Sequence, residues 1–564
     1  KGPSSVLYGQ GSTGGIINMV TKRPEAETKG ELWAQLGNFD RKQVAGDITG
    51  SVDDDDTLLY RLVGLVRDSG TQTDYVDDNS VFLAPSLTWN ASDATSITLL
   101  TNFQKNETGS STQFFPHEGT ILPAKYGQIA SSRFVSEPGF DRYDTEQTSI
   151  NAIVDHELND YMSLHWSLRH MDSESTYYTM YAWPFDLQED KRSLLRAISM
   201  SEASAEALTS DLRFHADFNT GDIEHSIVLG ADYQNVETDN NRLFLWNTGG
   251  LIDVYEPSYG INPPQLPTSS DIPDAPSDTN IQLGFYVQDT IKFNNFIVNA
   301  ALRHDEVESR PGKEGESDKD QNATTGRFGI LYTFDNGIAP YASYSESFVP
   351  IYGSNELGEA FKPQTGEQIE LGVKYQPNGT EHLITASVFD ITDKNRKKSI
   401  TPNLTRQEGE VEIKGFELEA QLEWQQVDVY ASYAYTDSEI ISAAPPQQGA
   451  SLSAMPDHML SAWATYRPEN FLPGLKLGLG GRYVGETSDG SVDVIMNDIT
   501  LHTALNTDSY ALFDLMVGYE FDQFDISLNV DNIADKTVIT SCLARGDCFY
   551  GQRRTVTANL KYRF

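Results

Sequence analysis

The chain has 564 residues, and its 41 Lys and Arg against 82 Asp and Glu give a formal net charge of −41. Nucleic-acid-binding proteins need basic surfaces to pair with phosphates, so this charge excludes nucleic acid as a partner. The 27 Tyr and 26 Phe exclude an aromatic-poor, disordered chain. No run of about 18 to 20 consecutive apolar residues is present, which excludes membrane-spanning helices and leaves a membrane β-barrel open.

Residues 1–28 lie outside any strand pattern. They begin with Lys1 in place of Met and contain no signal peptide, which predicts a processed or truncated product. The GQGSTG string at residues 9–14 has the spacing of a dinucleotide fingerprint, but no βαβ unit with a distal acid surrounds it. We interpret its glycines as residues that permit tight turns and close backbone packing against a barrel wall.

From about residue 30 onward, apolar and polar residues alternate with the period of two that is typical of β-strands. At residues 161–169 one face is apolar and the other is polar. The same division recurs at residues 416–424 and 555–564, where the polar face carries Glu, Lys and Arg. Such charges suit an aqueous lumen better than the dry core of a sandwich, so the pattern predicts an all-β fold, a transmembrane β-barrel.

The connections between the strands alternate between short turns and longer polar segments. Pairs such as Asn336-Gly337 and Asn378-Gly379 supply the positive φ that tight hairpin turns need. Ten short turns and eleven longer connections join 22 antiparallel strands. Among the longer connections, the sequence predicts loops at residues 105–146, 172–206 and 236–279.

A barrel of 22 strands, spaced about 4.8 Å and tilted about 40°, has a diameter on the order of 40 Å. An opening of that width would leak unless something filled it. Residues 1–28 are the part of the chain left over from the strand pattern, and they are too few to fill the lumen.

Five strings spread along the chain carry a family resemblance. They are KGPSSVLYGQGSTGGIINMVTKRP at residues 1–24, TGDIEH at 220–225, FYVQDTIKF at 285–293, TFDNGIAPYASYSESFVP at 333–350 and CFYGQRRTVTANLKYRF at 548–564. The first resembles the end of the plug domain of TonB-dependent outer-membrane receptors, which precedes the first barrel strand. The others resemble the ferric-siderophore branch of that family, and within it the ferrichrome and hydroxamate receptors.

The resemblance implies a protein of the bacterial outer membrane in which residues 1–28 are the tail of a plug domain whose remainder is missing, and residues 29–564 are the 22-stranded barrel. It implies a receptor and energy-coupled transporter of ferric siderophores, of hydroxamate type such as ferrichrome. The expected partners are the ferric siderophore, a TonB-type energy-coupling protein that acts through the missing N-terminal region, lipopolysaccharide and outer-membrane lipid. A passive diffusion channel and a receptor for another metal chelate are the alternatives.

The binding hypothesis is an external basin of rings and hydroxyls that holds a bulky iron chelate. The iron in such a ligand is coordinatively saturated, so the protein supplies apolar surface and hydrogen bonds, and we expect no cofactor and no metal ligands. Interface girdle or loop packing is the alternative role for these rings. The resemblance places ligand-facing residues at Tyr8, Phe114, Tyr181, Trp183, Phe244 and Leu543, the last where an aromatic is expected. Tyr177, Tyr178 and Trp246 are further rings of the predicted loops.

Cys542 and Cys548 are the only cysteines, and both lie in the last long connection. In an oxidising periplasm or at the cell surface we expect them to form a disulfide, because two free thiols on an exposed loop would be unusual. The ten histidines show no metal-binding spacing. No nucleophile elbow or Ser-His-Asp string is present, so no enzymatic activity is expected.

Overall fold

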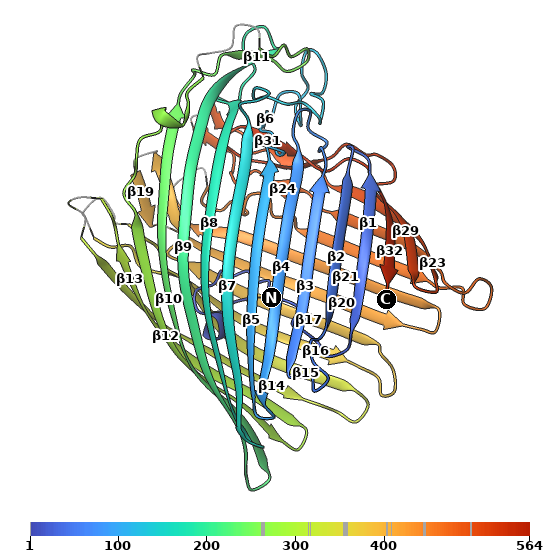
Figure 1. Cartoon of the computed structure of the whole chain (residues 1–564). Coiled ribbons are helices and arrows are strands. Elements are labelled where there is room, and N and C mark those ends of the chain that lie inside the picture. The colour runs from blue at the N-terminus through green and yellow to red at the C-terminus, as the bar shows by residue number, and fades with distance from the viewer. Residues whose placement is uncertain are drawn as a thin grey trace.

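The computed structural model describes residues 2–564 with the exception of 261–265, 314, 316, 354–358, 402–403, 408, 444–446 and 497–498. Its main sheet contains 23 strands, one of which, β11, pairs with an end of β9 and lies outside the wall. The other 22 are antiparallel and form a closed barrel (Figure 1), which confirms the predicted fold and strand count. No helix among the described residues is long and apolar enough to cross a membrane.

The wall strands follow one another around the barrel in chain order. They are β1 (Lys29–Gly37), β2 (Lys42–Ser51), β3 (Leu58–Asp68), β4 (Asp78–Ser92), β5 (Thr95–Thr108), β7 (Arg142–Asn159), β8 (Met162–Ala182), β9 (Ser193–Thr220), β10 (Ile223–Leu245), β12 (Asp278–Phe293), β13 (Phe296–Arg310), β14 (Lys319–Tyr332), β15 (Ile338–Val349), β16 (Gln364–Tyr375), β17 (Leu383–Lys394), β20 (Glu410–Glu423), β21 (Val427–Ser442), β22 (His458–Tyr466), β23 (Leu475–Val484), β28 (Tyr510–Phe521), β29 (Phe524–Asp531) and β32 (Thr555–Arg563). Strand β32 pairs with β1 and closes the ring.

The remaining elements are short. They are the helix α1 (Ser5–Tyr8), the 3-10 helix η1 (Ser269–Asp271), and the strands β6 (Phe115–Pro116), β11 (Leu251–Asp253), β18 (Lys397–Thr401), β19 (Leu404–Gln407), β24 (Thr487–Ser488), β25 (Val494–Met496), β26 (Ile499–His502), β27 (Asn506–Thr507), β30 (Ile539–Cys542) and β31 (Asp547–Tyr550). Apart from α1, which lies in the N-terminal segment, all of them lie in the long connections at one end of the barrel.

The short turns join the strands at the other end. Gly337 and Gly379 have φ angles of 84° and 74°, which confirms that these turns need residues that tolerate a positive φ. In outer-membrane barrels short turns face the periplasm and long loops face the outside. The long loops of this chain therefore mark its extracellular end.

Three predicted loops are shorter than the sequence indicated, and the second differs most. The connection from β5 to β7 spans residues 109–141, the one from β8 to β9 spans 183–192, and the one from β10 to β12 spans 246–277. The strands continue above the apolar band because their backbone ladder still satisfies every N–H and C=O there. In β8 and β9 the loops cover these extensions, since Ile272 packs against Met180 and Ile198 on the outer face and aromatic rings lie on the inner face. The division into one apolar and one polar face is therefore lost there.

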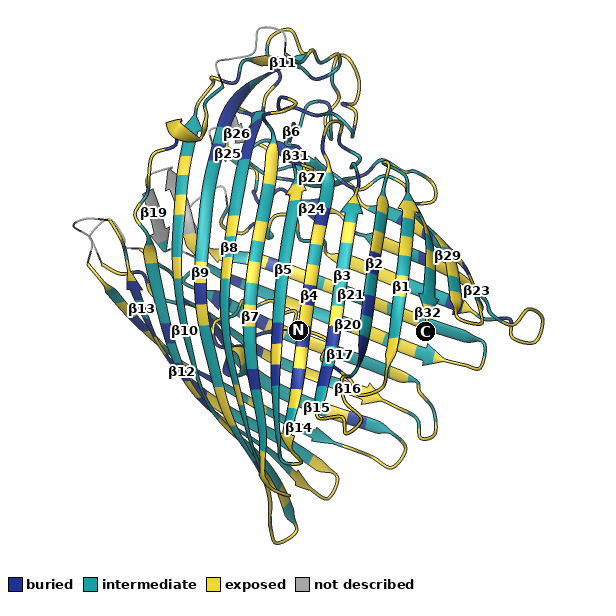
Figure 2. Cartoon of the chain, viewed as in Figure 1, coloured by how far each residue is buried: buried dark blue, intermediate teal, exposed yellow. Residues whose placement is uncertain are grey.

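The two faces of the wall differ as the sequence predicted. On β4, Leu83, Leu87 and Trp89 point outward and are exposed, as side chains that face lipid should be. Glu417 and Glu419, on the opposite face of β20 from Leu418, line a cavity inside the barrel. Figure 2 shows the resulting alternation of exposed and less exposed residues along the wall strands.

The N-terminal segment, residues 2–28, crosses the lumen. Helix α1 contacts β13, β14 and β15, and the backbone N–H of Gly11 donates to the Phe348 carbonyl at 2.9 Å. Gly9 has a φ of 75°, and a Cβ there would lie 3.0 Å from Gln282 Nε2 and 3.1 Å from Arg303 Nη2. This close approach to the wall agrees with the interpretation of the string at residues 9–14.

An ion network fixes the end of this segment to the wall. Arg61 donates to both carboxylate oxygens of Asp47, at 2.8 and 2.6 Å, and these side chains are only 8% and 4% exposed. From the segment, Lys22 Nζ donates to Asp47 at 2.6 Å. Arg61 also donates to the Arg23 carbonyl and to Glu25, both at 3.0 Å.

We expect Asp47→Asn to release the N-terminal segment. The substitution removes the buried carboxylate that holds both Arg61 and Lys22 and leaves Arg61 only the half-exposed Glu25, and breaking a buried pair costs about 3 to 5 kcal/mol. Trypsin cleavage after Lys22, followed by mass spectrometry, should become faster. Asp155→Asn is the matched control, since its pair with Arg23 is exposed on both sides and such pairs contribute about 0 to 1 kcal/mol. Equal cleavage rates in the two variants would contradict this role of the network.

Candidate ligand-binding site

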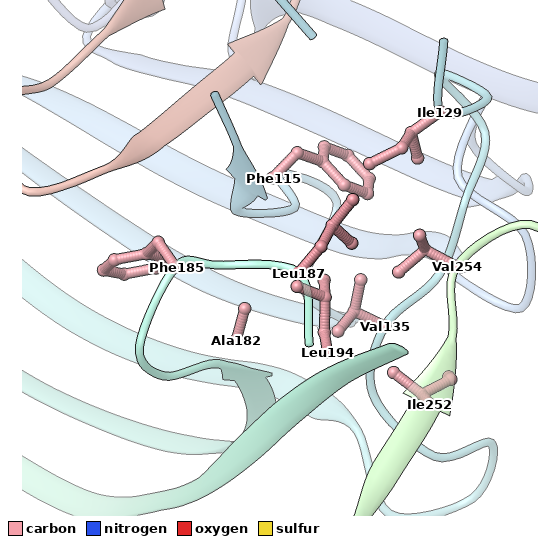
Figure 3. Packing of buried hydrophobic residues seen from close by; sticks show 9 residues of the cluster. All are labelled: Phe115, Ile129, Val135, Ala182, Phe185, Leu187, Leu194, Ile252 and Val254. Atoms are coloured by element: carbon pink, nitrogen blue, oxygen red, sulfur yellow. The ribbon is translucent and has the colours of Figure 1, made fainter. Parts of the chain in front are cut away.

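The long loops pack against one another over the barrel mouth. Figure 3 shows the apolar core that they share, which joins loops 109–141, 183–192 and 246–277 and the ends of β8 and β9. Its buried members are Phe115, Ile129, Val135, Ala182, Phe185, Leu187, Leu194, Ile252 and Val254. Burial of this many apolar side chains gives the loops a fixed arrangement.

Polar contacts hold the same loops in place. Arg196 is 3% exposed and donates to Glu137 at 2.9 Å and to the Val135 carbonyl at 3.0 Å. The hydroxyl of Tyr259 donates to the Phe134 carbonyl at 2.7 Å. Burial raises the pKa of Tyr259 to about 12, so this hydroxyl keeps its proton at neutral pH.

The last loop, residues 532–554, is tied to loop 109–141. Cys542 and Cys548 form the predicted disulfide, and their strands β30 and β31 join β6 in a three-stranded sheet in which Cys548 pairs with Phe115. Nearer the wall, Arg553 donates to both carboxylate oxygens of Asp535 at 2.9 and 2.7 Å. These bonds lower the pKa of Asp535 to about 2. The ion pair is therefore complete at neutral pH and is lost only as the pH falls through about 2.

Aromatic side chains from four connections and from the upper ends of β8 and β10 meet inside the mouth. We call the set Phe114, Tyr181, Trp183, Phe185, Phe244, Trp246 and Phe549 the ring cluster. Its centroid distances are 5.4 Å for Phe114–Tyr181, 5.9 Å for Tyr181–Phe244, 4.5 Å for Phe244–Trp246, 5.1 Å for Trp183–Trp246, 5.2 Å for Trp183–Phe185 and 5.4 Å for Phe114–Phe549. Most of these pairs are tilted or edge-to-face, the arrangements that aromatic quadrupoles favour.

Beside the ring cluster lies a cavity of about 820 Å³, which we call the basin. Its lining consists of Gly109, Ser110, Ser111, Thr112, Phe114, Tyr143, Ser175, Tyr177, Tyr181, Ser199, Met200, Ser201, Ala203, Asn240, Arg242, Leu243 and Phe244. A cavity of this size is in the range that encloses a small-molecule ligand. The combination of rings and hydroxyls offers apolar surface together with hydrogen-bond donors.

The basin lies on the lumen side of the wall. Tyr177 and Tyr181 share the face of β8 opposite to Trp166, which points outward and is exposed. Tyr178 was expected beside them in a loop, and this expectation is wrong. It lies on the outer face of β8, buried against Phe140 at a centroid distance of 5.9 Å, because consecutive strand residues point to opposite faces.

The structure brings together four of the six ligand-facing residues that the resemblance implied, namely Phe114, Tyr181, Trp183 and Phe244. Tyr8 lies apart, on α1, where it lines another lumen cavity. Leu543 lines neither cavity, and its carbonyl accepts a hydrogen bond from His117 at 3.1 Å.

Several residues of the basin could not be identified from the sequence. Ser199, Ser201 and Arg242 resemble the ordinary polar wall of a lumen, so nothing in their pattern marks them. Phe549 of the ring cluster was also missed, but it follows Cys548 directly, and the disulfide could have shown that its loop is held over the mouth.

Two groups of side chains in the described part of the chain have the composition of a metal site. His170, Asp172 and Glu206 lie together on the outer wall. His117 lies near Cys542 and Cys548, but the disulfide occupies both sulfur atoms. The expectation that the protein has no metal centre stays a prediction.

A closed antiparallel barrel with a lipid-facing outer band, short turns at one end and packed loops at the other defines a transmembrane β-barrel of the bacterial outer membrane. Residues 46–533 match the family described as "TonB dependent receptor-like, beta-barrel". The chain belongs to this family of receptors.

The full chain is 32% identical to the ferrioxamine B receptor of Salmonella typhimurium strain SL1344 and covers 79% of its length. It is 30% identical to the ferrichrome outer membrane transporter/phage receptor of Escherichia coli K12 and covers 78% of it. In fold it is similar to the ferripyoverdine receptor of Pseudomonas aeruginosa, with a TM-score of 0.87 at 20% identity, over all of this chain and 75% of that one.

Proposed function

We propose that this protein is a receptor and energy-coupled transporter for ferric siderophores of the hydroxamate type. The observation that carries the proposal is the basin, which lies at the extracellular mouth and combines the rings of Phe114, Tyr181 and Phe244 with hydroxyl donors. A saturated iron chelate needs such surface and no protein ligand to its metal. The names of the ferrioxamine B and ferrichrome relatives support the same ligand class.

The proposed mechanism begins at the basin and ends at the N-terminal segment. We propose that residues 1–28 are the tail of a plug domain and that a TonB-type energy-coupling protein acts through the rest of that domain. The contacts of residues 2–28 with the lumen wall support this assignment. Tyr8, which is 52% exposed in the lumen, is proposed to meet the ligand from the plug side.

We also propose contact with lipopolysaccharide around the outer wall. Acidic side chains such as Asp172 and Glu206 lie on the outer face of β8 and β9, above the apolar residues of the same strands. Divalent cations would bridge them to lipopolysaccharide phosphates. The role proposed for the protein is transport, with no catalytic step.

The test is uptake of radioactive ferric trihydroxamate by cells that lack other hydroxamate receptors and express this protein with its plug domain. We expect uptake that saturates with ligand and stops when a protonophore collapses the proton gradient. A passive channel would admit the chelate without saturation and without the gradient. Either of those two results would reject energy-coupled transport.

A further inference from the structure

The basin contains no carboxylate. Its 17 lining residues include nine with hydroxyl groups and none with an acidic side chain, although the chain has 82 Asp and Glu. Asp141 lies nearby, but its oxygens accept from the Ser110 backbone N–H and the Thr179 hydroxyl, both at 2.7 Å. Hydroxyls donate well to neutral oxygen acceptors, whereas a buried ammonium needs a carboxylate to offset its lost hydration.

The one formal charge in the lining is positive. Arg242, on the lumen face of β10, donates from Nε to the Asn240 amide oxygen at 2.8 Å. Among the described residues it forms no ion pair. Arg545, which contacts the ring cluster from the last loop, differs because both of its bonds go to the Asp547 carboxylate, at 2.7 and 2.8 Å.

Two fields of opposite sign therefore act on a ligand. The chain as a whole has a formal net charge of −41. This negative charge repels a strongly anionic chelate at long range. Within the basin, the unpaired Arg242 and the missing carboxylates oppose a cation. An uncharged chelate is the ligand class that neither field disfavours.

We propose that the basin selects uncharged ferric chelates rich in acceptor oxygens and discriminates against chelates that carry a free ammonium group. A cyclic ferric trihydroxamate is neutral, because three hydroxamate anions balance Fe³⁺. A linear trihydroxamate with a terminal ammonium carries one positive charge, and a ferric tris-catecholate carries three negative charges. This inference rests on the proposed siderophore function and specifies its substrate class.

The test is an equilibrium fluorescence titration of the detergent-purified protein, expressed with its plug domain, with these three chelates at physiological salt. We expect the neutral chelate to bind at least about tenfold more tightly than either charged one, which corresponds to about 1.4 kcal/mol. Arg242→Glu should narrow or reverse the preference for the neutral over the cationic chelate. Arg213→Glu is the matched control, because it changes the net charge equally but its residue lies outside the basin.

Two results would overturn the inference, and a third would overturn the proposed function. Equal binding of the neutral and cationic chelates by the unsubstituted protein would overturn the inference and leave the siderophore function standing. The same conclusion would follow if Arg242→Glu and Arg213→Glu shifted the preference equally. If no chelate bound to protein whose barrel is folded by heat modifiability, the proposed function itself would fail.

Discussion

Deletion of Phe564 is expected to remove most of the folded barrel from the outer membrane. Phe564 and Gly30 exchange two backbone hydrogen bonds, at 2.9 and 3.0 Å, at the seam where the last strand meets the first. The ring of Phe564 lies over Gly30, where a Cβ would be 2.5 Å from the ring. It also ends an aromatic stack, at 5.7 Å from Tyr562. The deletion removes the closing backbone pair and one interface aromatic together.

Heat-modifiable barrel in isolated outer membranes is the measurement. Phe564→Tyr keeps both the ring and the backbone pair, so it should assemble normally. Phe521→Ala is the matched control, because Phe521 belongs to the same run of interface rings, 5.5 Å from Phe524, but lies away from the seam. A normal yield of folded barrel from the deletion would show that the seam does not depend on its terminal residue.

The fold could be predicted because two independent patterns agreed. Period-two alternation indicated the strands, and the alternation of short turns with longer connections set their number, since turn residues such as Asn336-Gly337 are typical of hairpin connections. The predicted strand ends are wrong where the wall rises above the lipid-facing band. Strands β8 and β9 have 21 and 28 residues, far more than the roughly 10 that a tilted membrane strand requires. Their upper parts pack against loops instead of lipid and mix polar side chains with buried ones such as Met180 and Ile198, a pattern that resembles a loop in the sequence.

The sequence pointed to the large residues of the candidate site and missed its small ones. Rings such as Tyr181 and Phe244 stand out because a polar loop has no other reason to hold them. The hydroxyls of Ser199 and Ser201 become part of a basin only through the register that sets Tyr181 opposite Ala197, between β8 and β9. Leu543 lines neither cavity and stays a prediction, whereas Phe549 of the same disulfide loop packs against Phe114.

In the protein with its plug domain, Tyr181→Ala is expected to weaken binding of a neutral ferric trihydroxamate by about 1 to 3 kcal/mol, or roughly 5- to 150-fold in Kd. Tyr181 belongs to strand β8 itself, so it is held more rigidly than a loop residue and loses little entropy when a ligand arrives. It lines the basin and touches both Phe114 and Phe244. Its removal therefore takes away an anchor and the support of two neighbouring rings.

Substitutions of neighbouring rings distinguish the loss of a basin contact from a general loss of aromatic packing. Within the ring cluster Trp183 packs against Phe185 and Trp246 but lies outside the basin lining, so Trp183→Ala should have a smaller effect than Tyr181→Ala. Trp246 is 50% exposed at the edge of the cluster, and Trp246→Ala should cost least. Tyr181→Phe distinguishes the ring from its hydroxyl, since a Kd near that of the unsubstituted protein would assign the affinity to the ring. Wild-type binding by Tyr181→Ala, with the barrel intact by heat modifiability, would place the ligand elsewhere, because a chelate seated in the basin cannot avoid this side chain.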